Sequence, residues 1–198
     1  MNKIGISLVA MLFPVVVGAQ TQSPTPSAVA QDGATISPSR PVPVGKAPGM
    51  TWRMLKEEGE DKSYVIIFHA GDEALSGLTD FAIEHKIKSA HFTAIGAAQS
   101  ATLAWLDLSQ KTYRKIAVGE QCEVLSLIGD IAVLDGKPAT PVVHMHAVLG
   151  HSNGSTVGGH VFELNVNPTL EVFMTTDYYP LKKVPDEASG MKLIDPNK

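Results

Sequence analysis

The pattern of apolar and polar residues predicts a series of β-strands in the second part of the chain. Residues 64–69 (YVIIFH) form a short β-branched and aromatic run, which is typical of a buried strand. Further strands are expected at 90–97, 101–107, 112–118, 123–134, 142–150, 156–166 and 170–176. Most connections between them are short, and a parallel crossover needs about a dozen residues, so neighbouring strands should pair in antiparallel fashion.

One principal helix is expected between the first two of these strands. Asp72 follows Gly71 and is predicted to be its N-cap, and the helix should run to about His85. Leu75, Leu78 and Ala82 recur at helical spacing and give the helix one apolar stripe. The fold class that follows is α+β, with a mostly antiparallel sheet and one principal helix packed against it.

The first residues have the composition of a cleavable signal peptide. Lys3 is followed by an uncharged, mostly apolar run over residues 4–17, which is shorter than the roughly 20 residues of a membrane-spanning helix. Small residues at 17–19 predict cleavage after Ala19. We therefore expect a signal peptide at residues 1–19 and a mature protein that is periplasmic or secreted and not membrane-bound.

Residues 20–49 are predicted to be a disordered linker. Six of the 13 prolines lie in this segment among Ser, Thr, Ala and Gln. It has too little apolar surface to offset the entropy lost on ordering. Residues 50–198 remain as one domain, long enough to enclose a hydrophobic core.

Charge and cysteine content narrow the function classes. The formal net charge is −4 and becomes one unit more negative when Lys3 is removed with the signal peptide. The basic residues are scattered, which argues against a nucleic-acid surface. Cys122 is the only cysteine, so no intrachain disulfide can form, and we expect a buried thiol.

Three histidines could converge on one metal ion. His144 and His146 alternate along one predicted strand and therefore point to the same face, while His160 follows a double glycine on the next strand. A three- or five-residue loop centred on Asn153 would place His146 opposite His160. A two- or four-residue loop would turn His160 away unless a bulge at Gly158-Gly159 restored its direction.

Three imidazoles with an open fourth position are typical of a catalytic zinc site and also suit other divalent transition metals. Glu123, Glu163 and Glu171 lie on neighbouring predicted strands, and each could act as a fourth ligand, a partner of a ligand or a general base. The histidines could instead be ordinary polar residues of a half-exposed sheet or of a subunit contact.

The order of motifs from about residue 52 to residue 194 resembles the plant and prokaryote conserved (PPC) domain family. The matching segments are Gly71-Asp72-Glu73, Ala94-Ile95-Gly96-Ala97, residues 123–129 (EVLSLIG), Asp135-Gly136-Lys137-Pro138, residues 144–149 (HMHAVL), Gly158-Gly159-His160-Val161, Thr169-Leu170-Glu171-Val172 and residues 186–193 (DEASGMKL). The resemblance implies a compact α+β homotrimer, with His144, His146 and His160 near the subunit boundary.

Bacterial members of that family are often named as DNA-binding proteins, but this chain departs from that role. Its nearest approach to an AT-hook, residues 37–41 (SPSRP), lacks the flanking basic residues and the glycine. DNA binding is therefore the weakest of the candidate functions. A more distant similarity in fold, to acetolactate decarboxylases, would have the same three histidines hold a metal that polarises a carbonyl or activates water.

Two interpretations follow. In the first, the protein is an exported trimeric module that binds a metal or a small-molecule ligand of unknown identity and is not an enzyme. In the second, it is a metal-dependent lyase or hydrolase acting on a small carbonyl or carboxylate compound.

Overall fold

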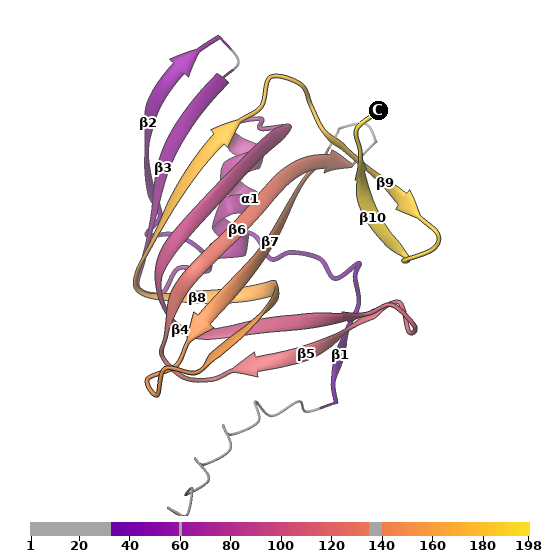
Figure 1. Ribbon diagram of the computed structural model, residues 1–198. Helices are drawn as coiled ribbons and strands as arrows, with labels where there is room; N and C mark the ends of the chain where they lie inside the picture. The colour runs from indigo at the N-terminus through magenta and orange to yellow at the C-terminus, as the bar shows by residue number, and fades with distance from the viewer. Residues whose placement is uncertain (1–32, 60, 135–139) are drawn as a thin grey trace, which may run out of the picture.

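The computed structural model describes residues 33–59, 61–134 and 140–198 (Figure 1). The predicted signal peptide and residues 20–32 of the predicted linker lie outside these residues. The strands are β1 (Thr35–Ile36), β2 (Thr51–Glu58), β3 (Asp61–His69), β4 (Ser89–Asp107), β5 (Thr112–Val118), β6 (Cys122–Leu134), β7 (Thr140–Gly150), β8 (Thr156–Thr176), β9 (Lys182–Asp186) and β10 (Met191–Asp195). One helix, α1 (Ala74–Glu84), lies between β3 and β4.

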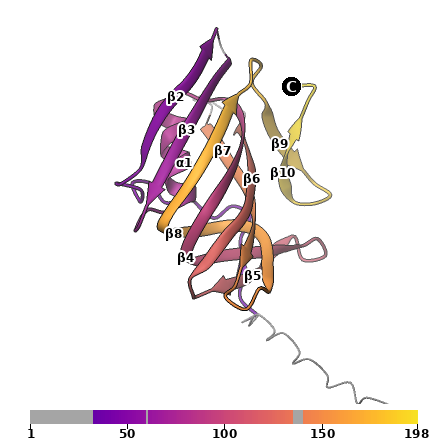
Figure 2. The ribbon, with the colours of Figure 1, turned by 60° about the vertical axis from the view of Figure 1, so that its left-hand side comes forward.

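The described strands form one sheet in the order β1-β5-β4-β6-β7-β8-β3-β2. An additional pairing between β4 and β8 closes β4, β6, β7 and β8 into a ring of neighbours. All pairings are antiparallel except the short one between β6 and β9, whose partner β10 completes a C-terminal hairpin beside the sheet (Figure 2). The expected α+β class with a mostly antiparallel sheet and one helix is therefore confirmed.

The hydrophobic core lies between α1 and the inner face of the sheet. Leu78 and Phe81 of the helix have no exposed surface, and they join Phe68, Met145 and Leu164 from three strands in one cluster. Burial of such a side chain contributes about 1.5–3 kcal/mol to folding. Figure 1 shows the helix lying against β7 and β8, which fixes the two strands that carry the candidate histidines.

The N-cap of α1 is Glu73, so the prediction of Asp72 was wrong. The Glu73 carboxylate accepts hydrogen bonds from the N–H groups of Leu75 at 3.0 Å and Ser76 at 2.7 Å. Asp72 instead accepts from the N–H groups of Gly49 and His69, both at 2.8 Å. Asp is the more usual N-cap residue, but the path of the chain places the Glu73 carboxylate, and not that of Asp72, at the free N–H groups.

Two pairs of predicted strands prove to be single bent strands, β4 and β8. Along β4, Ala98 pairs with Val166 and Gly96 with Leu170, so β8 has two extra residues between these pairs. This bulge contains Pro168, which lacks the N–H that a regular ladder would need. Because β4 and β8 bend, the two halves of each strand pair with different neighbouring strands.

The sequence pattern did not indicate β1, β2, β9 or β10. The side chains of β2 are all exposed, so this edge strand has no apolar alternation to reveal it. Residues 33–49 of the predicted linker contact the domain: β1 pairs with β5, and the N–H groups of Gly45 and Lys46 bind Asp80 and Ser76 at 2.7 and 3.1 Å. Over the described residues, no helix has the length and apolar character needed to cross a bilayer.

Candidate metal centre

The hairpin formed by β7 and β8 sets the register of the three histidines. His146 pairs with His160 and Gly150 with Thr156, which leaves a five-residue loop centred on Asn153. The Asn153 side chain accepts a hydrogen bond from the N–H of Ser155 at 2.9 Å and so fixes the turn. Of the two registers that the sequence left open, the structure has the one that places His146 opposite His160 on one face.

The double glycine before His160 serves a close backbone approach and not a bulge in the pairing with β7. A Cβ atom on Gly159 would lie 2.6 Å from the backbone oxygen of Ala104 in β4. Without that Cβ, β8 can lie between β7 and β4, where His160 pairs with His146 on one side and Ala104 on the other. The glycine therefore brings His160 into the cluster.

His144, His146 and His160 bring three ring nitrogens together. One nitrogen from each ring can be chosen so that all three lie within 4.8 Å of one another. The Nε2 atoms of His144 and His146 are 3.2 Å apart. Two ligands of a tetrahedral zinc ion with Zn–N bonds of about 2.0–2.1 Å are separated by roughly 3.3 Å. Two of the imidazoles thus already have the separation of zinc ligands, and the third offers a nitrogen within 4.8 Å of a nitrogen of each.

The environment favours the neutral, metal-binding form of His146 and His160. Burial, followed by the charges of His144 and His146, lowers the pKa of His160 to about 3. Burial and the charge of His144 also lower the pKa of His146. The Nδ1 atom of His160 is buried and has no hydrogen-bond partner among the described residues. The donor set and this unpaired nitrogen therefore fit a bound metal ion.

Buried, unpaired ring nitrogens also occur on His85 and His151, but neither belongs to the three-residue group. His85 stacks on Phe81 at a centroid distance of 4.2 Å, and His151 pairs with Glu120 through its other ring nitrogen at 2.7 Å. Within the described residues, the group of three histidines is what distinguishes the candidate site.

Asp130 and Lys183 adjoin the cluster, and sequence reasoning missed both. The Asp130 Oδ2 atom is 2.9 Å from His144 Nδ1, and its Oδ1 atom is 3.1 Å from Lys183 Nζ. Burial raises the pKa of Asp130, but the hydrogen bond with His144 and the charge of Lys183 outweigh it and leave that pKa below its usual value. Asp130 is the one charged residue after Glu123 in the predicted strand 123–134, and this was the available signal.

Two aromatic rings contact His160, Tyr113 from β5 and Phe162 from β8 itself. Tyr113 stacks on the imidazole with a centroid distance of 4.8 Å and an interplanar angle of 26°, and Phe162 lies at 4.9 Å. Burial raises the pKa of the Tyr113 hydroxyl. Tyr113 was not singled out in the sequence because β5 lies far from β8 along the chain and is brought near it by β4.

The three candidate glutamates do not join the histidine cluster. Glu163 bonds with Asn165 at 3.1 Å and lines a shallow hollow with Arg40 and Lys115. Glu171 is exposed and pairs with Ile95 in register, while Glu123 is exposed and pairs with Gly150. Their proposed roles as ligand or general base remain predictions, and the carboxylate that contacts a histidine of the cluster is Asp130.

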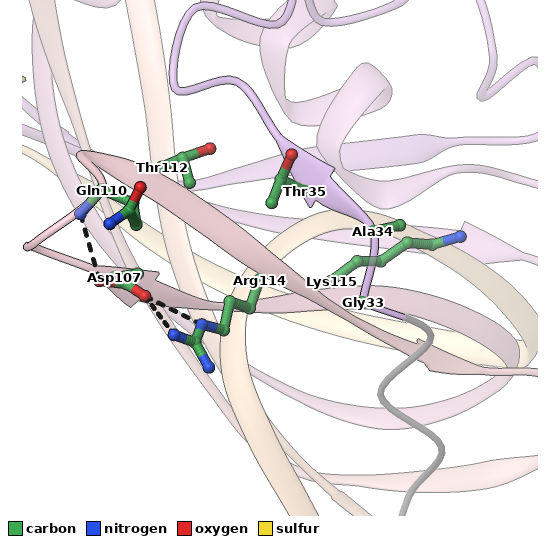
Figure 3. A pocket seen from close by; sticks show the side chains of 8 residues that line it. All are labelled: Gly33, Ala34, Thr35, Asp107, Gln110, Thr112, Arg114 and Lys115. Atoms are coloured by element: carbon green, nitrogen blue, oxygen red, sulfur yellow. Dashed lines mark hydrogen bonds and ion pairs between the residues drawn. The ribbon is translucent and has the colours of Figure 1, made fainter.

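A hollow of about 310 Å³, whose lining does not include the histidines, lies beside the N-terminal strand β1 (Figure 3). Its lining residues are Gly33, Ala34, Thr35, Asp107, Gln110, Thr112, Arg114 and Lys115. Hydrogen bonds from Ser109 and then Arg114 lower the pKa of Asp107 to about 2. Because its carboxylate is already bonded to these two residues, the hollow is a weaker candidate than the histidines.

Comparisons with known proteins agree with this fold. The sequence profile of the Plants and Prokaryotes Conserved (PCC) domain matches residues 55–176. A metal-containing protein from Archaeoglobus fulgidus is 28% identical, with a TM-score of 0.62, over 73% of this chain and 97% of that one. A PPC protein from Pyrococcus horikoshii is 25% identical, with a TM-score of 0.63, over 75% and 96% of the two chains.

A candidate DNA-binding protein from Ralstonia eutropha JMP134 is also similar, with 25% identity and a TM-score of 0.61 over 67% of this chain and 90% of that one. No curated protein matches the sequence. The resemblance to the PPC family that the motifs suggested is thereby confirmed.

Proposed function

The chain belongs to the Plants and Prokaryotes Conserved domain family, and from that premise we propose that it is an exported homotrimeric module that binds a divalent transition metal. The ligands are His144, His146 and His160. The observation that supports this most strongly is the gathering of their ring nitrogens within 4.8 Å, with two of them 3.2 Å apart.

Zinc is the metal that this donor set suits best. Three neutral imidazoles without a thiolate favour zinc or another divalent ion of similar preference, and they leave one coordination position for water or a small ligand. A bound metal would act as a Lewis acid at that position. The A. fulgidus relative is named as a metal-containing protein, which supports the same proposal for this chain.

An exposed apolar area beside His146 supports self-association. Ile95 and Ile128 are 60% and 58% exposed, and Phe173 and Val148 are also exposed on neighbouring strands. Ile128 pairs with His146, while Thr93 pairs with both Ile128 and Phe173, so these side chains share one face. Monomeric proteins rarely leave such an area open. We propose that further copies of this chain cover it.

The chemistry around the histidines favours binding over turnover. A lyase or hydrolase that transfers protons at the metal would use a free general base beside it. The carboxylate in contact with the cluster, Asp130, is already paired with His144 and Lys183. The net charge of −4 gives no support to DNA binding.

Metal analysis of the purified mature protein tests the site. We expect about one zinc ion per chain by elemental analysis, and the His144→Ala/His146→Ala variant should take up none, because two of its three ligands are lost. His91→Ala, which removes an exposed histidine outside the cluster, is the control and should bind as the wild type does. Stoichiometric zinc on the double variant, or none on the wild type, would overturn the proposal. Turnover of a small carbonyl compound by the wild type, but not by the double variant, would favour the interpretation as a metal-dependent lyase or hydrolase.

Light scattering tests the assembly. The wild type should have the mass of a trimer, and Ile128→Asp should give a monomer, because it places a charge in the apolar area. Leu108→Asp changes a similarly exposed apolar residue in the connection after β4 and should leave the trimer intact. A monomeric wild type would contradict this part of the proposal. N-terminal sequencing of the exported protein should begin at Gln20.

A further inference from the structure

The hydrogen bond between His144 and Asp130 determines which nitrogen of His144 can face a metal. The carboxylate Oδ2 of Asp130 lies 2.9 Å from Nδ1, so the ring proton is held on Nδ1. The lone pair is then on Nε2, the atom that lies 3.2 Å from His146 Nε2. The contact thus presents the correct atom of His144 to the centre of the cluster.

Lys183 holds the other oxygen of the same carboxylate. Its Nζ atom is 3.1 Å from Asp130 Oδ1, and its side chain is only 7% exposed. A buried ammonium group is costly unless it is paired with an opposite charge, so this position of Lys183 depends on an ionised Asp130. One oxygen of the carboxylate is therefore at hydrogen-bond distance from His144 and the other forms an ion pair with Lys183, and this pair favours the observed orientation of the carboxylate.

The position of Lys183 comes from the C-terminal hairpin. Strand β9 runs parallel to the end of β6, with Lys182 beside Val133 and Lys183 beside Leu134. The N–H of Val133 donates to the carbonyl of Leu181 at 2.9 Å and fixes the start of this pairing. The hairpin therefore brings a buried positive charge to the strand that carries Asp130, next to the strand that carries His144.

We propose that Asp130 and Lys183 are positioning residues of the histidine site, and that the C-terminal hairpin β9–β10 completes that site by delivering Lys183. Asp130 orients His144 and strengthens it as a ligand, and Lys183 acts only through Asp130. This inference rests on the proposed metal-binding function. It gives Asp130, Lys183 and the β9–β10 hairpin a role in the site beyond that of the three histidine ligands.

Zinc titration calorimetry separates this role from a structural one. Loss of a hydrogen-bond partner of a metal ligand typically lowers metal affinity about 10- to 100-fold, and we expect this for Asp130→Asn. Lys183→Met should lower zinc affinity about 3- to 10-fold, because Asp130 keeps its bond to His144 but loses its anchor. The double variant should bind no more weakly than Asp130→Asn alone, since Lys183 acts through Asp130.

The matched control is Lys192→Met, an exposed lysine on β10 of the same hairpin, which should not change zinc affinity. Circular dichroism and thermal melting show whether each variant keeps its fold. Wild-type affinity in both Asp130→Asn and Lys183→Met, or additive losses in the double variant, would overturn the inference while leaving the three-histidine site standing.

A measurement on the metal-free protein tests the orienting role of Asp130 independently of whether the histidines bind zinc. Nitrogen NMR of the metal-free protein at about pH 8, where imidazoles are neutral, reports which nitrogen carries the proton. His144 should be protonated on Nδ1 in the wild type and should become a mixture of tautomers in Asp130→Leu. An unchanged tautomer in that variant would overturn the orienting role even if the wild type bound no zinc.

Discussion

The start of α1 and the histidine cluster are both clusters of polar side chains, and they differ in whether all of their polar atoms have hydrogen-bond partners. At the helix start, Glu73 accepts from the N–H groups of Leu75, Ser76 and Leu164 at 3.0, 2.7 and 2.9 Å. At the cluster, the Nε2 atoms of His144 and His146 are at hydrogen-bond distance from each other, but His160 Nδ1 has no partner among the described residues. Glu73 therefore has its hydrogen-bond partners within the protein, whereas the histidine cluster has a ring nitrogen without one.

This difference separates a structural cluster from a candidate binding site. A buried carboxylate that accepts three backbone N–H bonds joins the helix to β8 and stabilises the fold. A buried imidazole nitrogen without a partner costs free energy in the metal-free protein. Such a cost is offset when a metal ion takes up the lone pairs, so the incomplete cluster is the one suited to a ligand.

The largest expected effect comes from removing the Glu73 side chain at the start of α1. Glu73→Ala should lower the free energy of unfolding by about 3 kcal/mol, because it leaves three N–H groups without an acceptor and removes the helix cap. Chemical denaturation measures the change. Glu84→Ala, at the exposed C-terminal end of the same helix, should change stability by less than about 0.5 kcal/mol. Loss of zinc binding by a still-folded Glu73→Ala protein would contradict the separation of the two clusters.

The two regions also differ in how far the sequence predicted them. The register of His146 against His160 was one of two that the sequence allowed, because pairing along a hairpin is local and depends on the loop length, and the structure has the five-residue loop centred on Asn153. Asp72 and Glu73 were adjacent acceptors, and their roles depended on where residue 49 and β8 lie in space. Asp130 and Lys183 come from strands whose neighbours are set by the sheet order, which no local pattern contains.

The contrast between local and long-range pairing also explains which strands the sequence analysis failed to predict. The helix and the inner strands were predicted because their apolar positions recur with the period of one buried face. Strand β2 has only exposed side chains, and the bend of β8 around Pro168 depends on the backbone of β4. Long-range pairing, unlike amphipathic periodicity, leaves little trace in a single sequence.

The two clusters should respond to acid in opposite directions. The pKa of His160 is lowered to about 3, so the unfolded chain binds its proton first, and stability falls as the pH drops below the ordinary value of 6.5. From pH 6.5 to 5.5 this group alone should cost the metal-free protein about 1 kcal/mol. Burial raises the pKa of Glu73, so that group favours the folded state as the pH falls toward 4.5. Denaturation of the metal-free wild type at a series of pH values measures the sum.

The smallest effect should come from filling the incomplete cluster with carbon. His160→Phe keeps an aromatic ring beside Tyr113, which stacks on the imidazole at 4.8 Å, but removes the buried nitrogen that has no partner. The metal-free variant should be as stable as the wild type at neutral pH or more stable by up to about 1 kcal/mol, and it should lose part of the acid sensitivity assigned to His160. It should also bind zinc more weakly, because one of three ligands is absent. If urea denaturation showed the free energy of unfolding to fall by more than about 1 kcal/mol, His160 would stabilise the fold without a metal. In that case the histidine cluster would belong with the helix start as a structural group.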